Sequence, residues 1–126
     1  MKHNKLVRDR IPELIRENGG VAITRILDQS ELRRMLEEKL REEVEEFLSG
    51  REAEELVDVL EVVYALASER GVSEDELEHL RQIKRTERGG FDDGIFLIEA
   101  IDEGETGSSR SDPTFGFASR RSPDVR

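Results

Sequence analysis

Apolar residues recur at helical spacing in three consecutive stretches of the sequence, and only a few residues separate one stretch from the next. The predicted helices cover residues 31–49, 52–70 and 73–88. Ser30 is suited to cap the first helix, and Gly50 and Gly71 end the first two. Ser73, with Glu76 three residues later, gives the third helix a capping-box pattern. Helices joined by such short turns pack antiparallel, so the sequence predicts an all-α fold, an antiparallel helical bundle.

Two weaker elements flank these helices. A short helix capped by Asp9 is predicted to run through Asn18, because Pro12 falls in its first turn, where a missing N–H costs nothing. Residues 21–27 have an extended pattern, and the apolar run 95–98 is too short for a helix of its own. We expect these two segments to pair as a minor two-stranded ribbon.

The composition changes near the C-terminal end. We expect one helical domain over residues 1–102, which is a modest single-domain size. From Glu103 onward, ten of the 24 residues are Gly, Pro or Ser, and four acids balance four arginines. Such a segment cannot bury enough apolar surface to fold, so residues 103–126 are predicted to form a disordered tail.

Charge and cysteine content restrict the class of protein. The formal net charge is -10, which repels phosphate backbones, so no nucleic acid is expected as a partner. Without cysteine there is no disulfide and no thiolate zinc site, and the start of the sequence does not resemble a signal peptide. The stretch with the fewest charges, 56–67, is far shorter than the ~20 apolar residues of a membrane span. We therefore expect a cytoplasmic protein without membrane contact.

Acidic side chains occur on the apolar side of the first long helix. At about 100° per residue, Glu43 and Glu46 fall on the flank of the buried apolar stripe. Glu45 falls on the far side, where we expect it to contact solvent. The geometry therefore excludes the pair Glu42 and Glu45, which has the same i,i+3 spacing.

The helix 52–70 carries a second acidic pair in a sharper setting. It is apolar around most of its circumference, as expected at the centre of a bundle, yet Glu55 lies inside the apolar sector and Asp58 at its edge. A buried carboxylate must be protonated, paired with a base or bound to a cation. An i,i+3 acidic pair on each of two antiparallel helices brings four carboxylates to one point. Such oxygen ligands favour Mg2+, with Mn2+ as a substitute and Ca2+ as a candidate inhibitor.

These acidic pairs have a counterpart in a known family. Glu43-x-x-Glu46 followed by Glu55-x-x-Asp58 resembles the metal signature of the MazG-like all-α nucleoside triphosphate pyrophosphohydrolases. The likeness covers residues 5 to about 101 and is strongest to the phosphoribosyl-ATP pyrophosphohydrolase-like branch. The blocks that resemble this branch are KLVRDRIP at 5–12, KLREE at 39–43, EELVDVL at 54–60 and ERGGF at 87–91.

The resemblance implies an enzyme. Its reaction is hydrolysis of a nucleotide between the α- and β-phosphates to a monophosphate and pyrophosphate, with magnesium on the four matching acids. A neighbouring carboxylate, Glu42 or Glu46, is the candidate for orienting or deprotonating the attacking water. Four basic residues are candidates for binding the substrate phosphates: Lys5, Arg8, Lys84 and Arg88.

Several alternatives stay open. The candidate bases could instead pair with surface acids, and Lys39 could pair with Glu43 at i,i+4. The substrate could be a surplus or non-standard nucleotide, which is nucleotide-pool sanitation, or a dedicated nucleotide such as phosphoribosyl-ATP. A different class is a non-catalytic helical interaction or regulatory dimer that uses the acids in salt bridges. Because three helices leave a wide apolar surface on the helix 52–70, we expect a homodimer or higher homo-oligomer.

Overall fold

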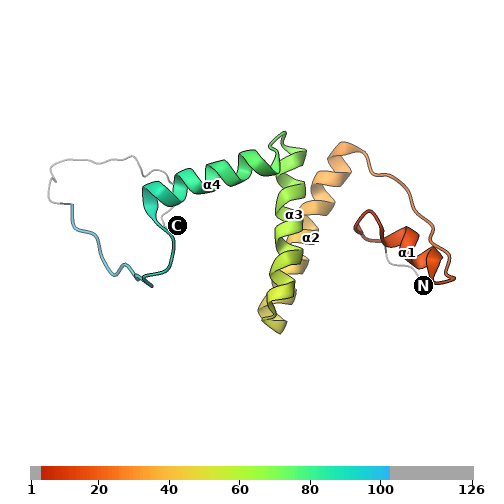
Figure 1. Ribbon diagram of the computed structural model, residues 1–126, viewed down its shortest axis with the longest axis horizontal. Helices are drawn as coiled ribbons and strands as arrows, with labels where there is room; N and C mark the ends of the chain where they lie inside the picture. The colour runs from red at the N-terminus through yellow and green to blue at the C-terminus, as the bar shows by residue number, and fades with distance from the viewer. Residues whose placement is uncertain (1–3, 103–126) are drawn as a thin grey trace. The chain divides into compact units, whose positions relative to one another are not determined.

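The computed structural model describes residues 4–102 of the 126-residue chain, and all regular secondary structure in this range is helical (Figure 1). The four helices are α1 (Ile11–Glu17), α2 (Gln29–Gly50), α3 (Ala53–Glu69) and α4 (Glu74–Arg88). The prediction of an all-α fold is thus confirmed. The chain divides into two units, Met1–Gly89 and Gly90–Arg126, and all four helices belong to the first. The predicted tail, 103–126, lies outside the described residues.

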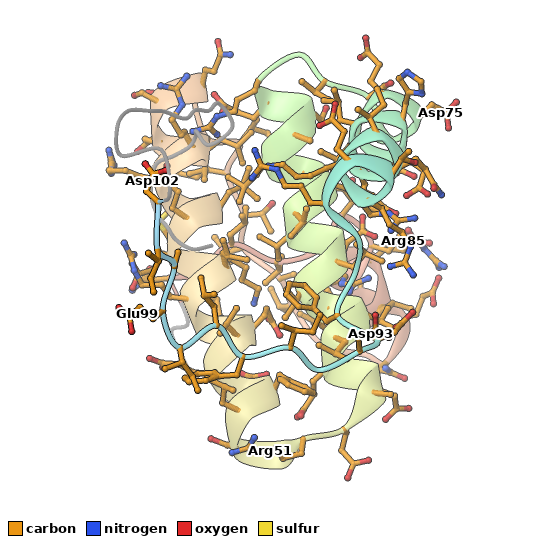
Figure 2. The ribbon with its side chains drawn as sticks, turned by 90° about the vertical axis from the view of Figure 1, so that its left-hand side faces the viewer. Arg51, Asp75, Arg85, Asp93, Glu99 and Asp102 are labelled. Carbon is orange, nitrogen blue, oxygen red and sulfur yellow. The ribbon has the colours of Figure 1, made fainter. Side chains whose placement is uncertain are left out.

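An antiparallel pair formed by α2 and α3 is the main packing unit (Figures 1 and 2). Its tight turn is centred on Arg51, which adopts a left-handed conformation at φ 63° and caps α2. Leu36 of α2 and Val62 of α3 are the buried apolar side chains of the described residues. The next helix, α4, packs against α3, whereas α1 packs against none of the other three.

The helix starts follow local hydrogen bonding and correct two of the predictions. Asp28, rather than Ser30, caps α2, because Glu31 stands at the third helical position and completes a reciprocal capping box with Asp28. At α1 the N-cap is Arg10 without a side-chain cap, so Asp9 lies one residue too early for that role. The capping box of Ser73 and Glu76 at α4 is confirmed.

The expected two-stranded ribbon is wrong for the described residues. Segments 21–27 and 95–98 are both irregular, and most of their apolar side chains are exposed, as at Ile23, Ile26 and Ile98. An isolated two-stranded ribbon is at best marginally stable in water, because it buries little without a third strand or a helix behind it. A run of apolar residues therefore does not by itself give a strand here.

Candidate metal centre

Glu43 is the buried acid of α2, with 7% of its surface exposed. Lys39, one helical turn earlier, places Nζ 3.2 Å from Oε2 of Glu43 and 3.0 Å from Oε1 of Glu42. Burial opposes the charge of Lys39, but the two carboxylates outweigh this effect and raise the pKa of the lysine. The ammonium group of Lys39 is therefore a positive charge that contacts both carboxylates. The alternative pairing of Lys39 with Glu43 is confirmed.

Glu46 lies one turn after Glu42 and Glu43 and is exposed. The charge of Glu43 is the largest cause that raises the pKa of Glu46, followed by partial desolvation and the charge of Glu42. Lys39 opposes this shift, and Glu55 of α3 adds to it. Acidic side chains of both helices thus act on Glu46. The helical projection put Glu43 and Glu46 alike on the flank of the apolar stripe; the structure buries Glu43 but leaves Glu46 exposed, and Glu45 is exposed as predicted.

Glu55 is partly buried and is oriented by the start of its own helix. Its Oε1 accepts a hydrogen bond from the backbone N–H of Glu52, 3.4 Å away. Gly50, the last residue of α2, lies close to the same carboxylate, since a Cβ at Gly50 would stand 2.6 Å from Oε1. A glycine at this position therefore leaves the space that the Glu55 carboxylate fills.

Asp58 follows one turn after Glu55 and pairs with the N-terminal segment. Nη2 of Arg8 donates a hydrogen bond of 2.7 Å to Oδ1 of Asp58. The two side chains are 51% and 43% exposed, so this is a surface ion pair. Arg8, predicted to bind substrate phosphates, is thus bound to an acid that was predicted to bind metal.

The structure brings together only part of the predicted site. Within residues 4–102, no three His, Cys, Asp or Glu side chains are close enough to hold one ion together. Lys84 and Arg88 lie on the last two turns of α4, a helix that joins α3 at the opposite end from Glu55 and Asp58. Lys5 is exposed in the N-terminal segment. The phosphate-binding roles of these three residues stay predictions.

Two features of the site were not predicted from the sequence. Gly50 was expected only to end a helix, and Arg8 was not expected to contact Asp58. The capping-box spacing of Glu52 and Glu55 is a local signal that could have predicted the orientation of Glu55 and its closeness to Gly50. For Arg8 and Asp58, fifty positions apart, the sequence offers no local signal.

The donor set nevertheless fits a hard divalent cation. All of the candidate ligands are carboxylates, the oxygen donors that Mg2+ prefers, and they come from two adjoining helices. Two cationic side chains already stand against these acids, Lys39 on Glu42 and Glu43 and Arg8 on Asp58. The raised pKa of Glu46 indicates that negative charge nevertheless remains in excess there.

Comparisons with known proteins add no relative: no protein-family model matches the sequence, and neither a curated protein nor a solved structure matches it. The resemblance to the pyrophosphohydrolases therefore rests on the sequence motifs alone. Among the helices of residues 4–102, none is long and apolar enough to cross a membrane.

Proposed function

We propose that this protein is a magnesium-dependent nucleotide pyrophosphohydrolase that cleaves the α–β phosphate linkage of a nucleoside triphosphate to a monophosphate and pyrophosphate. The observation that carries the proposal is that acids of the packed helices α2 and α3 lie near enough to act on one another: the charges of Glu43 and Glu42, and to a smaller extent that of Glu55, raise the pKa of Glu46. Acids held this close repel one another, so a divalent cation would stabilise their arrangement. The matching sequence blocks support the reaction class.

Each acid has a role in the proposed mechanism. Magnesium, held by Glu43, Glu46, Glu55 and Asp58, would supply neutralisation of the phosphate oxygens and acidification of a bound water. Glu42 and Glu46 are exposed and can reach solvent, which suits a residue that orients or deprotonates the attacking water. Glu43 is buried against Lys39, which suits a ligand that stays fixed. Lys5, Arg8, Lys84 and Arg88 are the proposed phosphate-binding residues.

A second copy of the chain would complete the helical bundle. On α3, Leu56, Val57 and Leu60 are 49%, 60% and 47% exposed, although this helix has the apolar circumference of a bundle centre. Exposed apolar side chains grouped on one helix are typical of an interface. We therefore include at least a homodimer in the proposal. Dimerisation would also cover the face of α3 next to its acidic side chains.

The test is pyrophosphate release with magnesium from a panel of nucleotides: standard, deoxy and damaged nucleoside triphosphates and phosphoribosyl-ATP. We expect release with a monophosphate as co-product, and loss of release in Asp58→Ala. The matched control is Glu45→Ala, which removes an acid from the solvent side of α2 and should retain activity. The substrates that react distinguish nucleotide-pool sanitation from a dedicated biosynthetic role. No release from any member of the panel would contradict the enzymatic proposal.

The ion pairs give some support to the alternative function, a non-catalytic interaction or regulatory dimer. Arg8 with Asp58 and Lys39 with Glu43 are contacts that such a scaffold would also use. The two functions differ in their response to magnesium. Binding to the folded state raises thermal stability by mass action, so the enzyme should be stabilised by Mg2+ and Glu55→Gln should lose this gain. A scaffold that uses the acids only in salt bridges should show no such gain.

A further inference from the structure

The N-terminal segment is tied to α3 through Arg8. This residue precedes α1, which packs against none of the other helices, yet its guanidinium reaches Asp58 on the second turn of α3. Asp58 is one of the four acids proposed to hold the metal. The ion pair thus connects the predicted phosphate-binding segment directly to the predicted metal site.

The ion pair of Arg8 and Asp58 is weak enough for a competing ligand to break it. A single N–O contact of 2.7 Å joins side chains that are 51% and 43% exposed, and exposed pairs are among the weakest ion pairs in proteins. A divalent cation would bring two positive charges to Asp58 and the other proposed ligands, whereas Arg8 brings Asp58 one positive charge. Bound to Asp58, the guanidinium is also less able to hold a phosphate, because its charge is already paired.

We propose that Arg8 exchanges partners during ligand binding: it leaves Asp58 when a divalent cation binds the carboxylates, and it then binds the phosphates of the substrate. This inference rests on the proposed function and adds a regulatory step to that site. Cation and phosphate binding then favour each other, because each removes a competitor of the other. Before the cation binds, the N-terminal segment is held on α3 by its own arginine.

Metal affinity tests the competition. Mn2+ binding, measured by electron paramagnetic resonance of the free ion, is compared among wild type, Arg8→Gln and Arg10→Gln. Arg10 is the matched control, since it lies two residues away and pairs with Glu13 on α1, with side chains that are 68% and 54% exposed. We expect Arg8→Gln to bind Mn2+ roughly two- to five-fold more tightly than wild type, the equivalent of one exposed ion pair. Arg10→Gln should stay within about two-fold of wild type.

Release of the segment is measured independently of affinity. The sequence has no cysteine, so Asn4→Cys provides a single site for a fluorescent dye. We expect Mg2+ to lower the anisotropy of the dye in the otherwise native protein. In the Arg8→Gln background the anisotropy should start low and not respond. Constant anisotropy at Mg2+ concentrations that saturate the protein would overturn the exchange.

The outcomes separate this inference from the proposed function. Equal Mn2+ affinity in wild type and Arg8→Gln would overturn the exchange alone, since the metal site would still exist. Absence of Mn2+ binding in the wild type would overturn both. Looser binding in Arg8→Gln would also overturn the exchange, because Arg8 would then be supporting the metal site instead of competing for Asp58.

Discussion

At the scale of single residues, the missing side chain of Gly50 leaves room for the Glu55 carboxylate. A Cβ at this position would meet the flexible end of Glu55, at 2.6 Å from Oε1 and 2.9 Å from Oε2. We expect Gly50→Ala to leave the folded protein intact, because alanine favours a helix over glycine by about 0.5–1 kcal/mol. The Glu55 carboxylate must move, so Mg2+ should raise the melting temperature less than in wild type.

The matched control for Gly50→Ala is Ser49→Ala, at the preceding residue of α2, which is exposed. Both variants are melted with and without Mg2+ in a thermal-shift assay. An unchanged response to Mg2+ in Gly50→Ala would show that the orientation of Glu55 does not matter to metal binding.

Glu46 gives a prediction about pH. Its pKa is raised, chiefly by the charge of Glu43, so the folded state binds a proton at this site more tightly than the unfolded state, whose pKa is about 4.5. Glu46 therefore favours the folded state most at a pH below its unfolded pKa. This contribution to stability is lost as the pH rises past the pKa of Glu46 in the folded state. We expect Glu46→Gln to stabilise the protein without divalent cations at pH 7 and to have little effect at pH 4.

Urea unfolding at the two pH values, with a chelator present, measures this difference. Glu45→Gln removes a neighbouring acid from the solvent side of the same helix and serves as the control. A Glu46→Gln variant that is less stable than wild type at pH 7 would mean that Glu46 takes part in a favourable interaction, contrary to the repulsion inferred here.

Predictability at this scale depended on whether a residue's neighbours are close in the sequence. Helical projection found the burial of Glu43 and the exposure of Glu45, because both follow from the stripe of α2 alone. The contact of Lys39 with Glu43 could be foreseen from the sequence for the same reason, because the two residues are four positions apart on one helix. Arg8 and Asp58 meet only after the chain has folded, so no sequence spacing indicates their contact.

At the scale of helices, α2 and α3 share a very small buried core. Leu36 is 6% exposed and Val62 is 7% exposed. Truncating a buried leucine to alanine costs about 2–5 kcal/mol through lost apolar burial and the cavity that remains. We expect Leu36→Ala to lower the free energy of unfolding by that amount, measured by urea denaturation. Leu80→Ala on α4, where the side chain is 55% exposed, should cost far less; equal losses would contradict this assignment of the core.

Helix number and order could be predicted from the sequence, whereas some helix starts could not. Periodicity and glycine stops define α2, α3 and α4 within a few residues. The start of α2 was missed because Asp28 and Ser30 are comparable capping residues. The difference between them is that Asp28 has a glutamate at the third position of the helix, which completes the capping box. The ribbon of 21–27 and 95–98 was predicted wrongly, because an apolar run carries no information about whether a partner strand exists.

At the scale of the whole molecule, α3 leaves apolar side chains exposed in the described part of the chain, whereas a helix at the centre of the proposed bundle would bury them. Fully burying a side chain such as Leu60 contributes about 1.5–3 kcal/mol, so this surface favours association with a second copy. We expect the protein to be at least dimeric at micromolar concentration and Leu60→Glu to shift it to the monomer, because the new charge would have to be buried in the interface. Sedimentation velocity over a range of concentrations measures the change.

The control is Ser68→Glu, which adds the same charge at an exposed position near the end of α3 and should leave the dimer in place. If Leu60→Glu dissociates the protein, its melting temperature should also become independent of concentration, since the free energy of association no longer contributes to stability. A wild-type protein that sediments as a monomer at every concentration would contradict the dimer. The exposed residues of α3 would then require another partner, and a metal site formed by α2 and α3 would have to function within one chain.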